Sequence, residues 1–150
     1  MRAVTLVTVL SLPLLSLASP SRSIRSLVRR QGTSKFCTRI TPAPTEEETE
    51  TRFDEFENLF LVKKDVYAAF EYILPEYINH NPLVENGAQN ALDLLGPIWA
   101  NQTITVLRTK FEGNMSWLNY RSGFGEIVDR FRWEDGCIAE HWDQGEKFPE

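Results

Sequence analysis

A carboxylate and an imidazole lie near the carboxyl end of the sequence, where they could act together as acid and base. Asp129 falls between Ile127 and Phe131 on the apolar side of an alternating run, and His141 follows in the next apolar segment. An acid among apolar neighbours must find a donor, face water in a cavity or keep its proton. The pair therefore either takes protons from a substrate or forms a structural ion pair, and the residues alone leave both open.

The geometry of this pair depends on the register of the hairpin that joins the two segments. A two-residue Asp-Gly turn would set Asp129 opposite Trp142, whereas a three-residue loop would set Asp129 opposite His141 and Arg130 opposite Glu140. We favour the three-residue loop because it pairs opposite charges on one face and acid with imidazole on the other. A slip of one residue would invert every side chain.

In the favoured register the two strands present one polar, concave face and one partly apolar, outer face. The concave face carries Asp129, Phe131, Ala139, His141 and Asp143, and the outer face carries Val128, Ile138 and Trp142. The outer strip suits a contact between two copies of the chain. We therefore expect a homodimer formed through the outer face of the sheet.

Three motifs resemble the pattern of SnoaL-like proteins, which are relatives of polyketide cyclases within the superfamily of nuclear-transport-factor-2-like (NTF2-like) proteins. They are His80-Asn81-Pro82, the run Val128-Asp-Arg-Phe-Arg-Trp-Glu-Asp-Gly136, and Glu140-His-Trp-Asp143. The resemblance covers residues 53–149. It implies an α+β fold shaped like a cone, in which three N-terminal helices pack on a curved antiparallel sheet, commonly as a dimer.

The resemblance also implies a pocket and a chemistry. Characterised cyclases of this kind close polyketide rings by intramolecular aldol condensation, without metal or organic cofactor, using an acidic residue as acid and base. It implies catalytic roles for Asp129, His141 and His80, and leaves open which of Asp129 and Asp143 takes the cyclase role. We expect the pocket to be lined by Trp99, Tyr120, Phe131 and Asp143. One departure is that the strand at 115–121 offers Asn119 or Tyr120 where similar proteins often carry a further histidine.

Local patterns predict the elements that position these residues. Apolar spacing from Phe53 predicts two consecutive helices, broken around Val62-Lys63 and closed by Pro75, and a third helix is expected at 87–100, kinked or ended by Pro97. A short extended piece is expected at 77–82. Strands are predicted at 103–111, 115–121, 124–133 and 137–143. Helices followed by a strand meander indicate helices on one face of an antiparallel sheet.

The N-terminal third of the sequence has the features of segments that are cleaved off during secretion, followed by a linker. Residues 1–18 have the apolar run and small residues of a signal peptide, and 19–30 are basic and end in Arg29-Arg30, typical of a cleaved propeptide. Residues 31–51 are rich in Thr, Pro and Glu and are expected to be a solvated arm, so that the domain spans 52–150. These features predict a secreted, extracellular protein.

Secretion agrees with two further features. Cys37 and Cys137 are expected to form a disulfide in an oxidising compartment, and Asn101 and Asn114 each begin a glycosylation sequon in an expected turn. Two cysteines and two histidines without ligand spacing argue against a zinc site.

The net charge and the hydropathy of the sequence argue against two classes of partner, nucleic acid and membranes. Loss of residues 1–30 removes five basic and no acidic residues, so the formal net charge falls from −5 to −10. Nucleic acid is then an unsuitable partner, because binding phosphates needs a basic surface. The apolar run at the N-terminus is shorter than a membrane span needs.

Two hypotheses remain for the pocket. One is an enzyme of the cyclase or isomerase type, in which Asp129 takes a proton beside a carbonyl, His141 orients it and His80 acts as a second acid. The other is a secreted module that binds an apolar or polyketide-like small molecule without turnover. The order of elements alone does not decide between them.

Overall fold

The computed structural model describes residues 36–150. The expected signal peptide and propeptide therefore lie outside the described residues. Within residues 36–150, none of the helices has the length and hydropathy that crossing a membrane requires.

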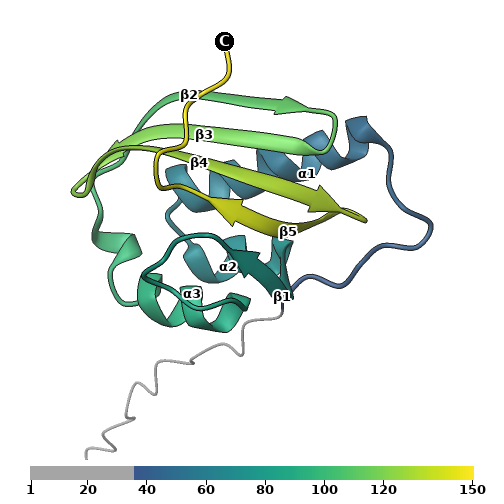
Figure 1. Cartoon of the computed structure of the whole chain (residues 1–150), viewed down its shortest axis with the longest axis horizontal. Helices are drawn as coiled ribbons and strands as arrows, with labels where there is room; N and C mark the ends of the chain where they lie inside the picture. Colours follow the sequence, from purple (N-terminus) through teal and green to yellow (C-terminus); the bar gives the residue numbers. More distant parts are fainter. Residues whose placement is uncertain (1–35) are drawn as a thin grey trace, which may run out of the picture. The chain divides into compact units, whose positions relative to one another are not determined.

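Helices come first and most of the sheet follows (Figure 1). The helical part comprises α1 (Glu46–Glu57), the π-helical turn η1 (Asn58–Val62), α2 (Val66–Ala69), the 3-10 turn η2 (Phe70–Tyr72), α3 (Ala88–Leu95) and the 3-10 turn η3 (Trp99–Asn101). The strands are β1 (Ile73–Asn79), β2 (Thr105–Glu112), β3 (Met115–Ser122), β4 (Gly125–Glu134) and β5 (Cys137–Trp142). These elements match the expected α+β class.

The strands form one five-stranded sheet in the order β1-β5-β4-β3-β2. Neighbouring strands are antiparallel except for β1, which pairs with β5 in parallel. The sheet is therefore antiparallel, as expected, except at this edge. Pro75 lies in β1, and an edge strand tolerates a residue without an N–H group.

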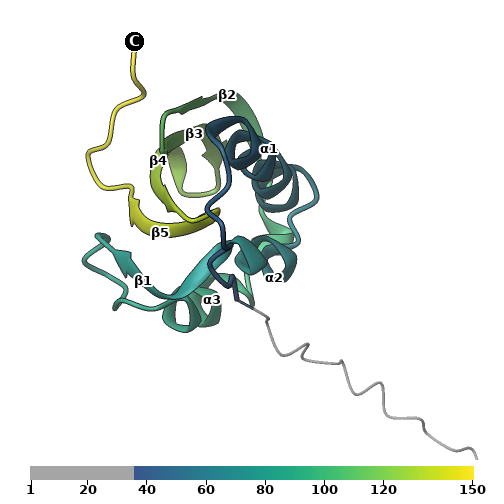
Figure 2. The same cartoon turned by 90° about the vertical axis from the view of Figure 1, so that its right-hand side faces the viewer.

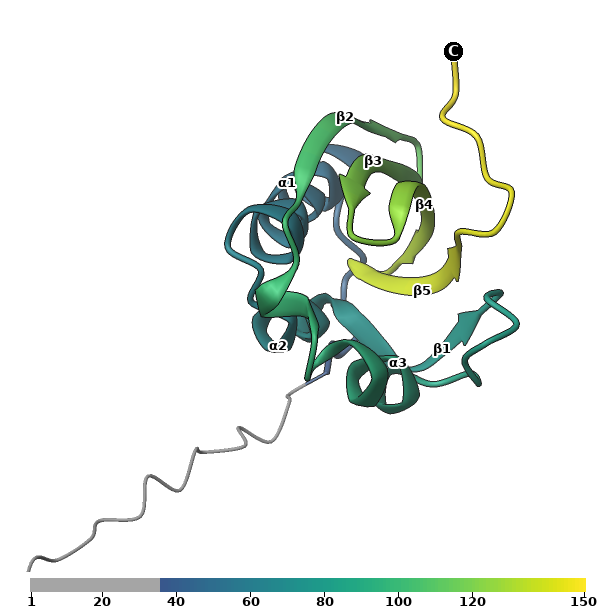
Figure 3. The ribbon, with the colours of Figure 1, turned by 90° about the vertical axis from the view of Figure 1, so that its left-hand side faces the viewer.

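The sheet is curved, and α1 and α2 lie on its inner side (Figures 2 and 3). Phe56 on α1 packs edge-on against Phe131 of β4, with ring centroids 5.2 Å apart. Phe53, one turn earlier, contacts Trp133 of β4 and Phe111 of β2. These aromatic contacts hold helix α1 on the concave face of the sheet.

Helix α1 begins earlier than the sequence indicated. Thr45 accepts a hydrogen bond from the backbone N–H of Glu48, and the Glu48 side chain accepts one from the N–H of Thr45, which completes a capping box. Three acidic residues occupy the first turn, where the helix dipole favours negative charge. The Glu-rich run placed in a solvated arm is thus the first half of a helix. The absence of apolar residues concealed it.

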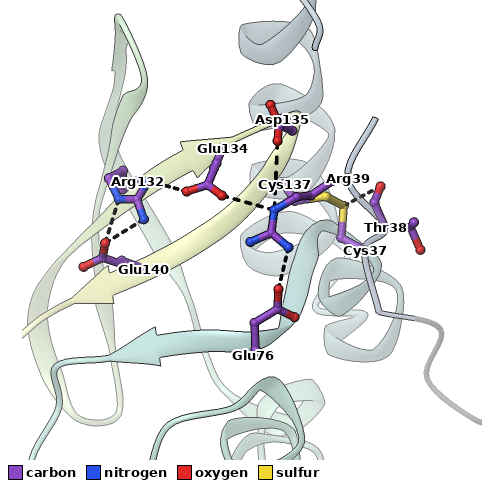
Figure 4. A network of polar contacts seen from close by, with 9 residues as sticks. All are labelled: Cys37, Thr38, Arg39, Glu76, Arg132, Glu134, Asp135, Cys137 and Glu140. Atoms are coloured by element: carbon purple, nitrogen blue, oxygen red, sulfur yellow. Dashed lines mark hydrogen bonds and ion pairs between the residues drawn. A yellow bond between two sulfur atoms is a disulfide. The ribbon is translucent and has the colours of Figure 1, made fainter. Parts of the chain in front are cut away.

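The arm from Phe36 to Pro44 is docked on the domain. The disulfide Cys37–Cys137 forms as predicted and ties the arm to the start of β5, across 100 residues of sequence. The Cys37 N–H donates to Ile73 O and the Ile40 N–H to Asp135 O, at 2.9 and 3.0 Å. Arg39 pairs with Glu76 and Glu134 beside the disulfide (Figure 4). Residues 36–44 therefore belong structurally to the domain.

At its tip the β4–β5 hairpin follows the two-residue alternative, and beyond the tip its register matches neither expectation. At the tip, Glu134 pairs with Cys137 across a two-residue Asp135-Gly136 turn, in which both residues have positive φ, as a type I′ turn requires. Further along, Arg132 pairs with Glu140 and Phe131 with His141, because one extra residue on β5 shifts the register. That residue is Ala139, and the irregularity is a β-bulge.

The bulge has two consequences for the predicted faces. Beyond it, His141 lies on the concave face with Phe131, so the predicted inward orientation of the imidazole is right although the predicted pairing is wrong. Before it, Ile138 lies opposite Trp133 and is fully buried. Ile138 is therefore core, and the expected outer strip loses a member.

Gly136 is the position of the turn where an added side chain is expected to cost most. Its φ is +77°, and a Cβ atom there would lie 2.8 Å from Ile40 Cδ1 and 3.0 Å from Pro44 Cγ. We expect Gly136→Ala to lower the free energy of unfolding by about 2 to 3 kcal/mol, from backbone strain and displacement of the arm. Urea denaturation measures it. Gly113→Ala is the matched control, since its φ is +65° and nothing lies within 4 Å of its added Cβ. Equal losses in both variants would contradict the contribution of the arm.

Candidate functional site

A cavity of about 580 Å³ opens between the concave face of the sheet and the helices. Aromatic and aliphatic side chains form most of its wall, among them Phe56, Phe60, Trp99, Phe131 and Leu95. Its volume falls in the range of small-molecule sites, and its wall is mainly apolar, as such sites usually are. One pocket for a small organic molecule is therefore present where the sheet and helices meet.

A carboxylate with two polar partners lies in this cavity. Asp129 is only 4 % exposed. Its Oδ2 accepts a hydrogen bond from the Tyr120 hydroxyl at 2.9 Å, and its Oδ1 lies 3.1 Å from His141 Nε2. The predicted pairing of Asp129 with His141 in space is thus observed. Each carboxylate oxygen has two acceptor sites, so Asp129 retains capacity for a further proton.

The imidazole ring of His141 is oriented by β1. Its Nδ1 lies 3.1 Å from Asn79 Oδ1, and the backbone N–H of Asn81 donates to the same oxygen. Because Asn79 Oδ1 already accepts from a backbone donor, the amide oxygen and not the nitrogen faces His141. Nδ1 is therefore the donor to Asn79, and Nε2 faces the carboxylate of Asp129. This geometry fixes which nitrogen addresses the acid.

Asp143 is a second carboxylate at the same end of the cavity. Asn81 Nδ2 donates to its Oδ2 at 2.6 Å. Its Oδ1 is buried and has no hydrogen-bond partner among the described residues. An unpaired buried carboxylate oxygen is costly, so this end of the cavity has an unmet need for a donor or a positive charge.

Two tyrosines complete the polar end. Burial, and then the charge of Asp129, raises the pKa of Tyr120 well above its usual value of 10.0. Burial likewise raises the pKa of Tyr77, followed by the charges of Asp129 and Asp143. Both hydroxyls are protonated at neutral pH. The Tyr77 hydroxyl makes no hydrogen bond to another described side chain, so it is free to donate to a ligand in the cavity.

These raised tyrosine pKa values predict a loss of stability in alkali. A phenol whose pKa is higher in the folded than in the unfolded state binds more protons when folded, so the stability is complete below the unfolded pKa near 10 and falls above it. We expect the urea midpoint to fall between about pH 10 and 11 and the fall to be shallower in Tyr120→Phe. A fall as steep in that variant as in the wild type would exclude Tyr120 as a source.

His80 is not in the cavity, which corrects its expected role as a second acid. Alternation along β1 points Tyr77 and Asn79 inwards and His80 outwards. Its ring stacks on Trp142, with centroids 4.5 Å apart, and its Nε2 lies 3.1 Å from Glu140 Oε2. Hydrogen bonds from His80 and Arg132 lower the pKa of Glu140, against a smaller opposing effect of burial. His80 therefore belongs to a surface network.

The same network covers the other face of Trp142. The Arg130 guanidinium lies 4.3 Å from its ring centroid and pairs with Glu146 at 2.9 Å. Glu140 pairs with Arg132 rather than with Arg130, because of the bulge at Ala139. With Ile138 buried, the expected outer strip keeps only Val128 and Trp142, and the homodimer stays a prediction.

The predicted pocket residues Trp99, Tyr120, Phe131 and Asp143 all line the cavity. Trp99 stacks on Phe60 with centroids 4.3 Å apart, and its indole N–H donates to Phe60 O at 2.6 Å. Sequence reasoning missed Tyr77, Asn79 and Asn81. Alternation in Tyr77-Ile78-Asn79 was the available signal, since a period of two puts both polar side chains on one face.

Asp129, His141 and Asp143 are also a group that could hold a metal ion. Each offers one ligand atom, and these atoms lie within 4.8 Å of one another. Two carboxylates and an imidazole are ligands that suit several divalent ions. Sequence spacing did not reveal this group because Asp129 comes from a different strand.

The two sequons lie at the surface of the described structure. Asn101 ends η3 and Asn114 lies in the turn between β2 and β3, and both side chains are exposed. Their glycosylation stays a prediction.

Solved structures share this architecture. An NTF2-like protein of unknown function from Burkholderia xenovorans LB400 has a TM-score of 0.57 and 16 % identity, over 70 % of this chain and 88 % of that one. The chain has the NTF2-like fold. Two further structures of similar fold have TM-scores of 0.51: AclR from Streptomyces galilaeus, a suggested hydroxylase, and a suggested ketosteroid isomerase from Kribbella flavida DSM 17836.

The match to AclR is 16 % identical and covers 66 % of this chain and 89 % of AclR. The match to the Kribbella protein is 15 % identical and covers 69 % and 84 %. No family model matches the sequence, and no curated protein matches it. At such identities the NTF2-like likeness establishes the fold, and the activity must be argued from the site.

Proposed function

We propose that the protein is an enzyme of the isomerase or cyclase type that moves a proton on an apolar small molecule held in the cavity. The proposal rests on the Asp129–His141 pair, which lies at the polar end of an otherwise apolar cavity of about 580 Å³. A carboxylate held by an imidazole beside a substrate-sized space is a standard arrangement for acid and base catalysis. The resemblance to SnoaL-like proteins supports the same class of reaction.

In the proposed reaction, Asp129 takes a proton from a carbon next to a carbonyl group. The C–H bond breaks, its electrons form an enolate, and the Tyr77 hydroxyl donates a hydrogen bond to the enolate oxygen. The enolate carbon then attacks a second carbonyl, whose oxygen takes the proton back from Asp129 as the new C–C bond forms, or Asp129 returns the proton to another carbon of the enolate. His141 is a positioning residue, since it contacts Asp129 Oδ1 and is held by Asn79.

An assay without a known substrate tests this proposal. The wild-type protein is incubated in D₂O with a panel of apolar cyclic ketones, and deuterium incorporation beside the carbonyl is followed by NMR. Incorporation faster than in buffer supports proton transfer. Ketones that bind without accelerated incorporation would favour the second candidate.

That candidate is a module that binds a small molecule without turnover. One observation favours it: both oxygens of Asp129 already lie within hydrogen-bond distance of protein side chains, the hydroxyl of Tyr120 and Nε2 of His141, as they would in a structural pair. In that case Asp129, His141 and Asp143 only orient the ligand. The two candidates share the cavity and differ in whether Asp129 reacts.

The proposed place of action is outside the cell, after removal of residues 1–18 and of the propeptide at 19–30. The Cys37–Cys137 disulfide supports this, because disulfides persist in oxidising compartments. Intact mass of the secreted protein tests it: a chain that starts at Gln31 is expected, and an uncut N-terminus would contradict the processing.

A further inference from the structure

The charge of the cavity lining indicates which charge an otherwise apolar ligand would carry. Among residues 36–150, its lining contains two carboxylates, Asp129 and Asp143, one imidazole, and no lysine or arginine. Two acidic side chains against one imidazole give the lining a surplus of formal negative charge. An anionic ligand would place a third negative charge among groups already within 4.8 Å of one another.

The two carboxylates differ in how their charge is balanced. Asp129 has a hydroxyl donor on one oxygen and an imidazole on the other. Asp143 has only the neutral amide of Asn81 on Oδ2, and its Oδ1 is buried without a partner. Arg130 does not line the cavity and is engaged with Glu146 and Trp142. Among the described residues, neither a hydrogen-bond donor nor a lysine or arginine side chain therefore pairs with Asp143 Oδ1.

The cavity wall is also suited to a cation. Aromatic rings of Phe56, Phe60, Trp99 and Phe131 line it, and Tyr77 stands at the polar end. Aromatic faces attract ammonium groups, and a partly enclosed carboxylate adds a charge-assisted hydrogen bond. An apolar body and an ammonium group would satisfy the wall and Asp143 together.

We propose that the natural ligand of this cavity is an apolar molecule that carries a protonated amine, with the ammonium paired to Asp143 and the apolar body against the aromatic wall. The inference rests on the proposed function in so far as the cavity must bind a small molecule. The inference specifies that the apolar substrate carries a positive charge. It assigns Asp143 to recognition and leaves proton transfer with Asp129.

Three probes with one skeleton test the proposal by isothermal titration calorimetry at neutral pH, with a chelator present: naphthylethylamine, naphthylethanol and naphthylacetic acid. We expect the amine to bind about 10- to 100-fold more tightly than the alcohol, and the acid not to bind. In Asp143→Asn the preference for the amine is expected to disappear while the alcohol still binds. Asp54→Asn, the same change on an exposed position of α1, should keep the preference.

The outcomes separate this inference from the proposed function. Equal binding of amine and alcohol, or tighter binding of the acid, overturns the inference and leaves the pocket as a ligand site. Binding of none of the three overturns both. Mn²⁺ alone is also titrated without chelator. If Mn²⁺ binds to the wild type and not to Asp143→Asn, and the amine binds no more tightly than the alcohol, the negative charge serves to bind a metal ion. That result overturns the inference.

Discussion

Asp129→Asn is expected to lower enzymatic deuterium exchange into a bound ketone by about 10²- to 10⁴-fold, the usual contribution of a positioned acid or base. Asparagine has the shape of aspartate and can still accept a hydrogen bond from Tyr120. Its amide oxygen is, however, too weakly basic to take a proton from carbon at neutral pH. The loss should therefore appear in the rate of exchange and not in ligand affinity. NMR measures the rate and calorimetry the affinity.

The control for this variant is Asp54→Asn, in which the same chemical change is made on the exposed side of α1. Its exchange rate should equal that of the wild type. Thermal unfolding of both variants shows whether the fold is kept. A folded Asp129→Asn protein that exchanges protons at the wild-type rate would remove Asp129 from the mechanism and direct attention to Asp143.

Reduction of the Cys37–Cys137 disulfide is expected to cost about 3 to 5 kcal/mol of stability, because the bond closes a loop of 100 residues in the unfolded chain. For a domain of this size the melting temperature should fall by about 10 to 20 °C. The arm at residues 36–44 would then be held by its backbone hydrogen bonds, by the packing of Ile40 and Pro44 beside Gly136, and by Arg39 (Figure 4). Calorimetry with and without a phosphine reductant measures the difference.

Arg39→Ala is the matched control for the arm. Its ion pairs with Glu76 and Glu134 are solvent-exposed, and exposed pairs contribute little. The melting temperature of Arg39→Ala should therefore stay close to that of the wild type in the oxidised protein. A fall as large as the one on reduction would show that the ion pairs, and not the covalent bond, hold the arm.

Local patterns predicted most of the secondary structure. Apolar spacing in the helices, alternation in the strands and the glycines and prolines at their ends are properties of neighbouring residues. Helix α3 ends at Leu95, before Gly96 and Pro97, as a proline requires. The start of α1 was missed because its first turns are polar and show no apolar spacing. The capping box at Thr45 and Glu48 stabilises this end of the helix.

The sequence by itself determined the α+β class, the partners of the disulfide, and the inward faces of Asp129, Phe131 and His141. Only the tertiary structure decided the bulge at Ala139, which sets the hairpin pairing. It also decided the parallel pairing of β1 with β5, by which Asn79 and Asn81 reach His141 and Asp143 across 62 residues of sequence, and His80 is left outside. The physical reason is that the alternation of side chains is a local property of the backbone. The pairing of strands depends instead on the relative stability of contacts between residues far apart in sequence, which no short pattern encodes.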